Sequence, residues 1–325
     1  MEERTKDISG IAVEARKRRP LLVDLLARLV REKPLGTVGA AIVLLLLLTG
    51  IFANYLAPYG ENEMTLLDRL QGPSAKYVLG TDNLGRDLFS RIIFGARVSV
   101  LVGLGVATLS SAVSLVIGMV SGYLGGKADI VIQRFVDAWM CFPGLFIILT
   151  VMAIVGPGLA QVILVLGMIY GINGSRTVRS AVIAIKENVY VEAARSIGAP
   201  TGLILLRHIV PNIMAPVIIV FTTRMGAAIL TEATISFLGY GIPPPAPSWG
   251  GMLSGPGRRY MRMAPGMALW PGLALAVVVY GINMFGDALR DLLDPRLRGG
   301  LGRYSGVEAK ARRKYRREAG AGTQP

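Results

Sequence analysis

Apolar residues in this chain form long uncharged stretches, which short charged segments separate. A membrane-spanning helix needs about 20 apolar residues, and several stretches reach that length. The long uncharged run after Asp137 exceeds one span, and Gly156-Pro157-Gly158 divides it. The pattern predicts an all-α polytopic membrane protein with six transmembrane helices. They are expected near residues 36–57, between Arg97 and Lys127, and near 131–155, 159–175, 213–239 and 267–288.

The segments outside these spans differ in character. Residues 20–33 place leucines on one helical face, which is typical of an interfacial helix lying against the membrane. Residues 58–97 and the Pro- and Gly-rich stretch 241–266 are predicted to be external loops, the second without regular structure. The tail from Gly299 is basic and predicted to be disordered. We therefore divide the chain into a cytoplasmic N-terminus (1–34), a first transmembrane helix and external loop (35–97), a transmembrane core (98–290) and a basic cytoplasmic tail (291–325).

Composition and charge agree with membrane insertion. Of the 325 residues, 52% are hydrophobic and 17% are charged, which excludes a disordered chain and argues against a soluble one. The net charge of +14 comes mainly from the two ends of the chain, where anionic lipid headgroups attract Lys and Arg, and it does not indicate nucleic-acid binding. Lys and Arg number 26 on the side that holds both termini and 8 on the other. The positive-inside rule predicts a multi-pass plasma-membrane protein with both termini cytoplasmic, anchored by an uncleaved first helix.

The sequence offers no catalytic set. Gly126-Lys127 is followed by Ala128 instead of Ser or Thr, and Ser121 replaces the first glycine of a phosphate-binding loop, so no nucleotide site is expected. The chain has one histidine, His208, and one cysteine, Cys141, which are too few for a zinc site or a disulfide framework. We expect no catalytic residue, no metal and no cofactor in this chain.

The predicted cytoplasmic loop 174–212 contains the most informative segment, YVEAARSIGAPTGLILLRHIVPN, at residues 190–212. Glu192-Ala193-Ala194 favours a short helix with a small-residue face, and Gly198 is placed to end it in a left-handed conformation. A second helix can begin at Thr201, and Pro211 is expected to mark re-entry into the next span. Such a compact knob suits docking into the groove of another protein, although the residues alone also allow an ordinary amphipathic connector.

At these residues the sequence resembles a known family. Glu192-Ala193-Ala194, Gly198 and the ending Ile209-Val210-Pro211 are similar to the EAA loop of ABC-importer membrane subunits, with the family's isoleucine moved by one place. Further stretches resemble the C-type permease of dipeptide, oligopeptide and nickel importers. They are LGTDNLGRDLFSRIIFGARVS (79–99), ILTEATISFLGYG (229–241), PPPAPSWGGML (243–253) and DPRLRGG (294–300).

The resemblance implies a type I ABC-importer permease fold and a set of partners. Two permeases of related sequence form the path as a heterodimer, two cytoplasmic ABC ATPases each grip one EAA loop, and an extracytoplasmic solute-binding protein delivers di- or oligopeptides. The residues implied in ATPase coupling are Glu192, Ala193, Ala194, Gly198 and Pro211.

Three ionisable residues lie within predicted spans: Asp137, Arg224 and Glu232. A charge at bilayer depth costs about 2.5 kcal/mol or more, so it usually faces a water-filled path or a partner. Glu232 follows Arg224 by eight residues, which places both on a similar face about 12 Å apart. These residues are candidates for the translocation pathway or for the permease interface.

Other functions remain open from the sequence. A nickel or other small-solute importer shares the same motifs, and we favour peptides because the sole histidine gives no sign of a metal relay. A secondary transporter acting alone would show inverted repeats, which we do not detect. A membrane-embedded enzyme would need a catalytic set, which the residues do not supply.

Overall fold

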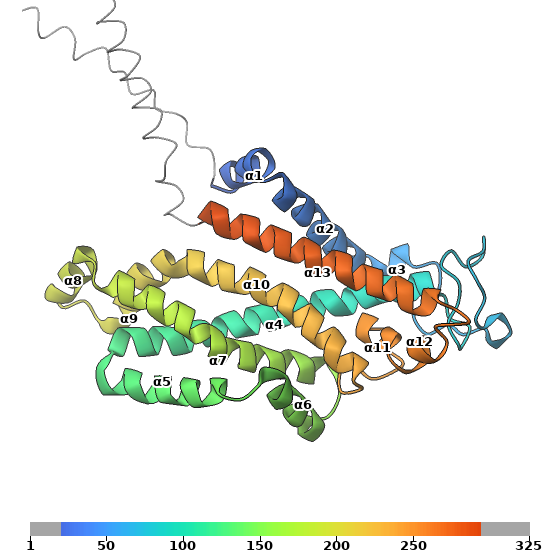
Figure 1. Ribbon diagram of the computed structural model, residues 1–325. Helices are drawn as coiled ribbons and strands as arrows, with labels where there is room; N and C mark the ends of the chain where they lie inside the picture. The colour runs from blue at the N-terminus through green and yellow to red at the C-terminus, as the bar shows by residue number, and fades with distance from the viewer. Residues whose placement is uncertain (1–20, 294–325) are drawn as a thin grey trace, which may run out of the picture.

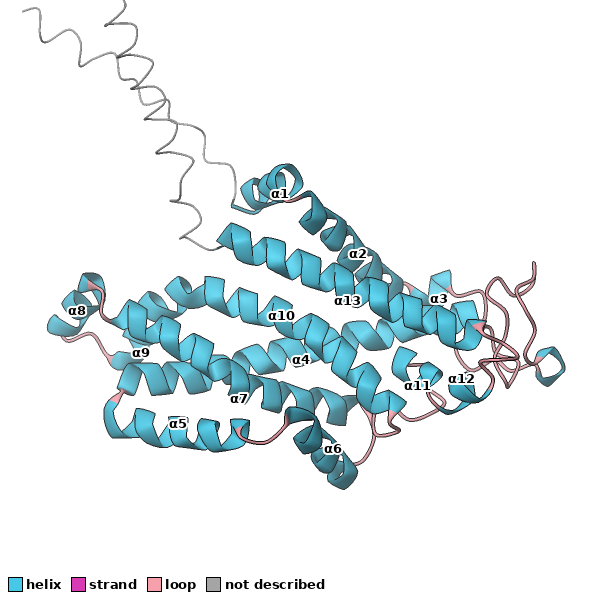
Figure 2. Ribbon diagram, viewed as in Figure 1, coloured by secondary structure: helices cyan, strands magenta, loops and turns pink. Residues whose placement is uncertain are grey.

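The computed structural model describes residues 21–293, and this part of the chain is built from helices connected by loops, without a strand (Figure 2). The predicted all-α class is therefore confirmed. Within residues 21–293, five helices are long and apolar enough to cross a membrane. They are α2 (Pro34–Ile51), α4 (Leu88–Leu124), α7 (Leu159–Lys186), α10 (Val210–Phe237) and α13 (Gly266–Leu293).

A sixth span is formed if two shorter helices are counted together. Helices α5 (Gly126–Met140) and α6 (Gly144–Val155) are bent by 87° at the break between them. The remaining elements are shorter: α1 (Leu21–Glu32), α3 (Ala53–Leu56), the 3₁₀ turn η1 (Leu66–Asp68), α8 (Val189–Ser196), α9 (Thr201–Ile204), the π-helical turn η2 (Leu205–Ile209), α11 (Trp249–Leu253) and α12 (Gly255–Arg259).

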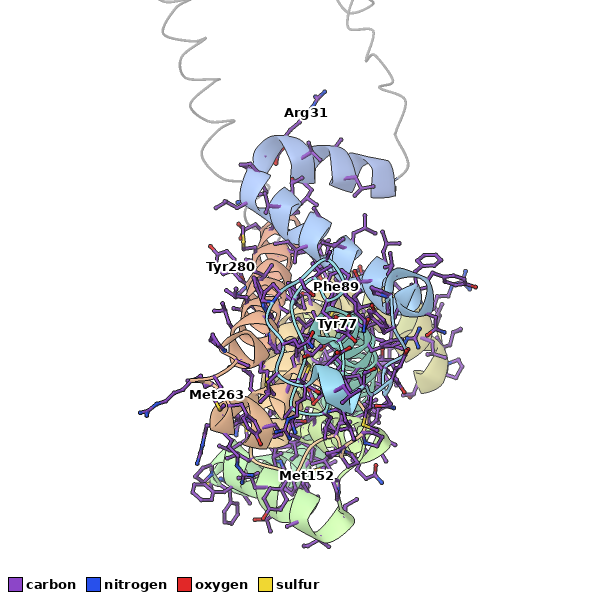
Figure 3. The ribbon with its side chains drawn as sticks, turned by 90° about the vertical axis from the view of Figure 1, so that its right-hand side faces the viewer. Arg31, Tyr77, Phe89, Met152, Met263 and Tyr280 are labelled. Carbon is purple, nitrogen blue, oxygen red and sulfur yellow. The ribbon has the colours of Figure 1, made fainter. Side chains whose placement is uncertain are left out.

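The long helices run roughly along one common direction (Figure 1). Helices α8 and α9 lie at one end, here called the α8 end, and α3, α11 and α12 lie at the opposite α11 end. The C-terminal end of α13 and the start of α2 both lie toward the α8 end. Viewed from the α11 end, α1 lies across the bundle direction (Figure 3). Such a helix lies flat on the membrane when the bundle spans it, as the interfacial interpretation of residues 20–33 requires.

Helix α4 occupies the centre of the bundle and packs against α7, α10 and α2. Its side chains belong to two apolar clusters, one with α7 and one with α2 and α13. The first contains Val102, Val106, Leu166 and Ile169, and the second contains Leu46, Ala107, Met225 and Ile282. These clusters hold together spans that are far apart in the sequence.

Helix α4 begins at Leu88, nine residues before Arg97, the predicted boundary of the second span. Asp87 caps its first turn by accepting a hydrogen bond from the backbone N–H of Ser90 at 2.8 Å. Arg91 and Arg97 therefore lie inside the helix. Arg97 donates from Nε to the carbonyl oxygen of Gly50 at 3.1 Å, so its charge does not prevent the helix from extending.

The third predicted span, 131–155, is not one straight helix. Pro143 precedes α6 with an extended backbone, because a proline cannot continue the α-helical hydrogen bonds of α5. The prediction of irregular structure for 241–266 was also wrong in part, since α11 and α12 form there. Ser248 caps α11 by accepting from the N–H of Gly251 at 3.0 Å, and Pro256 lies in the first turn of α12, where no amide hydrogen is needed.

Candidate functional site

The segment after α7 folds as a short helical knob at the α8 end (Figure 1). Val191 and Ala194 of α8 point inward and join an apolar cluster with Val178 and Val182 of α7 and with three isoleucines of the following segment, Ile204, Ile209 and Ile213. Glu192 and Ala193 are exposed. Small Ala194 brings α8 close to the bundle, while its neighbours remain free to meet another molecule.

Gly198 makes the turn that ends α8. Its φ of +79° is in the left-handed region, as predicted. The Gly198 N–H donates to the carbonyl of Arg195 at 3.0 Å, and the Ala199 N–H donates to that of Ala194 at 3.1 Å. This pair of bonds is the Schellman arrangement, which satisfies carbonyls at a helix end. A Cβ at Gly198 would meet nothing within 4 Å, so the left-handed backbone, and not a lack of space, favours glycine there.

The second arm of the knob begins at Thr201, as predicted, and continues without a break into the next span. Residues 201–237 form a single membrane-length helical segment, with α9 and the π-helical turn η2 leading directly into α10. Pro211 lies in the first turn of α10, at the point where the chain was expected to enter the next span. The proline ring would clash with the carbonyl four residues earlier in an α-helix, and the wider π turn over 205–209 relieves that clash.

The knob presents an apolar surface beyond the ends of the long helices. Val189, Ile197 and Leu206 are 81%, 85% and 70% exposed. Two ring contacts orient this surface: Tyr190 lies 6.3 Å from the ring of His208, and the guanidinium of Arg195 lies 5.7 Å from the ring of Tyr123. Exposed apolar side chains grouped at one place are typical of a protein–protein contact.

The knob is attached to helices that reach through the bundle. Lys186, at the end of α7, donates from Nζ to the carbonyl of Gly122 in α4 at 2.8 Å. Seven residues earlier in α7, Arg179 donates from Nε to the carboxylate of Asp129 in α5 at 2.6 Å. The hydroxyl of Ser121 in α4 donates to the same carboxylate. These bonds tie the end of α7, from which the knob extends, to α4 and α5.

Glycines allow α4 and α7 to approach closely at this level. A Cβ on Gly118 would lie 2.6 Å from the carbonyl oxygen of Ser175, and one on Gly122 would lie 3.0 Å from that of Arg179. Gly118 and Gly122 are four residues apart and therefore lie on the one face of α4 that meets α7.

The three intramembrane ionisable residues are not brought together. Asp137 of α5 pairs with Arg176 of α7, and Arg134 approaches the same carboxylate at 3.8 Å. Arg224 is half-buried, with its guanidinium 5.1 Å from the ring of Tyr170. Tyr170 in turn shares a 2.7 Å hydrogen bond with Thr231.

Glu232 is 1% exposed and accepts a hydrogen bond from Ser236 at 2.6 Å, and among the described residues it has no ion pair. The arginines of α7 at positions 176 and 179 were not singled out in the sequence. Their spacing of three residues places them on one helix face, and this was the available signal. Within residues 21–293 no group of three or more His, Cys, Asp or Glu side chains could hold a metal ion.

Comparison with known proteins gives consistent matches over most of the chain. Residues 114–299 match the family model of the binding-protein-dependent transport system inner membrane component, and residues 23–73 match the N-terminal transmembrane domain of oligopeptide transport permease C. A chain from the inward-facing MetNI methionine ABC transporter has a TM-score of 0.48 and 18% identity, covering 63% of this chain and 96% of that one.

Curated relatives are similar in sequence over nearly their full length. The glutathione transport system permease protein GsiD of Pectobacterium atrosepticum is 40% identical over 257 residues, which is 79% of this chain and 85% of the relative. The dipeptide transport system permease protein DppC of Alkalihalophilus pseudofirmus is 38% identical over 268 residues, covering 82% and 88%. The chain belongs to the family of binding-protein-dependent transport system inner membrane components, and it is a multi-pass membrane permease subunit of an ABC importer.

Proposed function

We propose that this permease imports di- or oligopeptides, forming the path with a second permease of related sequence as a heterodimer. The relatives named above transport a dipeptide or glutathione, itself a tripeptide, and their similarity extends over about four-fifths of this chain. That similarity carries the proposal. A nickel or other small-solute importer remains the second candidate.

In this proposal two ATPases bind the α8 ends of the two permeases, and neither ATP nor a metal is held by this chain. The exposed apolar knob around Ile197, with the left-handed turn at Gly198, supports the assignment. Glu192, Ala193 and Ala194 belong to its first helix, and Pro211 begins the helix that carries its motion onward. A solute-binding protein delivers the peptide at the α11 end.

The distribution of charge supports a cytoplasmic α8 end with both termini inside the cell. Arg224 then lies on the path or at the contact with the second permease. The half-buried guanidinium above Tyr170 and the lack of an ion pair within the described residues support this placement. Glu232 is buried against Ser236 within this chain, which favours a role in holding the α11 end of α10.

The test is uptake by the complete complex in proteoliposomes, made from this permease, its partner permease, both ATPases and the binding protein. We expect a labelled dipeptide to accumulate only with ATP inside and binding protein outside. Accumulation of Ni²⁺ instead would select the second candidate. Uptake that needs neither ATP nor binding protein would contradict the proposal and favour a secondary transporter.

A further inference from the structure

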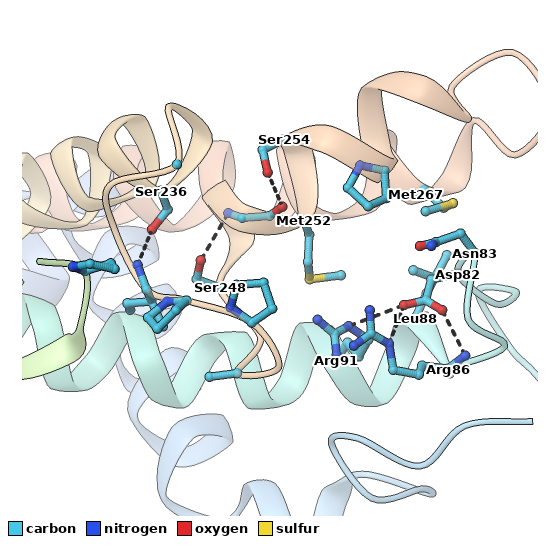
Figure 4. Close-up of a pocket in the computed structure, with 18 residues that line it drawn as sticks. Asp82, Asn83, Arg86, Leu88, Arg91, Ser236, Ser248, Met252, Ser254 and Met267 are labelled. Atoms are coloured by element: carbon cyan, nitrogen blue, oxygen red, sulfur yellow. Dashed lines mark hydrogen bonds and ion pairs between the residues drawn. The ribbon is translucent and has the colours of Figure 1, made fainter.

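A pocket of about 300 Å³ lies at the α11 end, between the first turn of α4 and the loop that joins α10 to α13 (Figure 4). Pockets for small ligands start near this volume and combine apolar walls with a few well-placed polar groups. One wall here is apolar and includes Pro157, Ile242, Met252 and Met267. The other carries Asp82, Arg86 and Arg91.

The charges that line the pocket do not balance. Asp82 accepts from the Nε of Arg86 at 2.6 Å, and its Oδ2 lies 3.8 Å from the Nε of Arg91. The other carboxylate oxygen, Asp82 Oδ1, accepts hydrogen bonds from the backbone N–H groups of Leu84 and Arg86 at 2.8 and 3.0 Å. One carboxylate therefore faces two guanidinium groups, and one positive charge is left without a counterpart in the pocket lining.

The neighbouring carboxylates of Glu61, Asp87 and Glu232 lie outside the pocket lining, so Asp82 is the only carboxylate among the described residues that lines it. Asp87 caps α4 through Ser90, and Glu232 lies behind Ser236, so neither lines the pocket. Glu61 is exposed, and it contributes its backbone carbonyl, which accepts from Arg91 at 3.2 Å. Two recessed cations that share one carboxylate are stabilised further when an anion or water completes their contacts.

The two arginines are placed to receive an anion inside the pocket. The side chain of Arg86 is 12% exposed and that of Arg91 is 8% exposed. Both lie beside Asp82 at the pocket wall (Figure 4). Within the described residues the Nη atoms of Arg86 have no hydrogen-bond partner. A guanidinium with free Nη groups binds carboxylates well, because its parallel N–H groups match the two oxygens.

We propose that this pocket binds the free carboxylate of a transported peptide, with Arg86 as the principal contact and the Pro- and Met-lined wall against the rest of the ligand. The inference rests on the proposed function, since it takes a peptide as the ligand. The recessed position favours a small ligand over a docking protein, which would meet exposed Arg258 and Arg259 of α12 first. The pocket then selects for a carboxyl terminus after release from the binding protein.

The experiment compares uptake of the dipeptide Ala-Phe with uptake of its C-terminal amide by the complete complex in proteoliposomes. Both are used below saturation, and the ratio of acid to amide uptake is measured. Because every variant is tested with the same binding protein, selectivity of that protein cancels between variants. We expect Arg86→Gln to lower the ratio about tenfold, the size of one charge-assisted hydrogen bond. Arg86→Lys should recover part of it.

Arg259→Gln is the matched control, because it removes one positive charge from the same end of the molecule without touching the pocket. Its ratio should equal that of the unmodified complex. Met252→Glu provides a second variant that leaves the arginines and Asp82 in place. The introduced carboxylate should pair with the arginines inside the pocket, compete with the peptide carboxylate and so lower the ratio. The inference can then be tested even if Arg86→Gln fails to assemble.

An unchanged ratio in assembled Arg86→Gln and Met252→Glu complexes would overturn the inference. Equal losses of acid and amide uptake, with weaker docking of the binding protein, would also overturn it and assign the arginines to docking. Failure of the unmodified complex to import either peptide with ATP would count against the proposed function instead.

Discussion

At the scale of single residues, the contacts of Arg224 allow its proposed role in transport to be tested. Its guanidinium lies over Tyr170, and Tyr170 is held by Thr231. Arg224→Met keeps much of the apolar stem and removes a charge from membrane depth, so insertion and assembly should be retained. We expect peptide uptake to fall about tenfold, which corresponds to about 1.4 kcal/mol in the transport barrier.

The measurement is uptake normalised to the amount of assembled complex. Tyr170→Phe is the control, because it keeps the ring below the guanidinium and removes only the bond to Thr231; its effect should be smaller. Wild-type uptake by Arg224→Met would mean that this charge is merely tolerated in the span.

Asp68 makes the loop before α4 sensitive to acid. Its carboxylate accepts from Lys76 at 2.7 Å and from Tyr77 at 2.8 Å, and these bonds lower the pKa of Asp68 below its usual value. A lowered pKa means that the ionised form stabilises the loop. That stabilisation is complete above the usual aspartate pKa of about 4 and is lost as the pH falls through the lowered value.

Hydrogen exchange of residues 58–87 across this pH range is the measurement. Protection should decrease below about pH 4 in the unmodified protein, and Asp68→Asn should remove that step while showing lower protection at neutral pH. Because the ion pair is exposed, the change should be modest and should weaken further in high salt. A pH-independent loop would show that Asp68 contributes nothing to its folding.

Among the helices, the close contact between α4 and α7 depends on Gly118 having no side chain. Gly118→Ala would place a Cβ 2.6 Å from the backbone oxygen of Ser175, and backbone cannot move aside cheaply. We expect a loss of about 1–3 kcal/mol in unfolding free energy and a lower melting temperature in detergent. Gly272→Ala is the control, since the nearest atom there is Leu253 Cδ2 at 3.8 Å. Equal melting temperatures for the two variants would contradict close packing at Gly118.

The sequence predicted the existence of the spans better than their limits. Hydropathy identifies a span because lipid demands a long apolar run, and α2, α7 and α13 follow that rule. It misses the start of α4, because Arg97 reaches the carbonyl of Gly50 from inside the helix. The bend at Pro143 and the π turn before Pro211 arise from proline sterics, and hydropathy does not register them.

The candidate site was predictable in part for similar reasons. The left-handed conformation of Gly198 follows from local turn chemistry, so the sequence could predict it. The pairing of Asp137 with Arg176 depends on how α5 folds back against α7, which no local pattern encodes. The imbalance between Arg86, Arg91 and Asp82 likewise becomes visible only when the loop after α10 closes the pocket.

For the whole molecule, orientation is the first quantity to test. Met263 is exposed at the α11 end and is therefore suited to labelling. After replacement of Cys141 by alanine, cysteines introduced at Met263 and Ser305 should react with an impermeant reagent from opposite sides of the membrane. Labelling of both positions from outside the cell would contradict cytoplasmic termini. It would also place the α8 knob away from ATP.

The central claim is that the knob at the α8 end couples ATP hydrolysis to this chain. Gly198→Asp and Gly198→Asn form a matched pair, because both residues tolerate the left-handed conformation and the space around Gly198 is open. They differ in one charge, which the aspartate would introduce beside exposed Ile197. A charge buried in an apolar contact without a partner is unfavourable, so the aspartate should weaken ATPase docking.

The decisive measurement is ATP hydrolysis by the reconstituted complex, with and without loaded binding protein. We predict that stimulation by the binding protein is lost in Gly198→Asp, through loss of ATPase subunits or through uncoupling, and is largely retained in Gly198→Asn. Full stimulation in the Gly198→Asp complex would contradict the account and reduce the knob to a connector between spans.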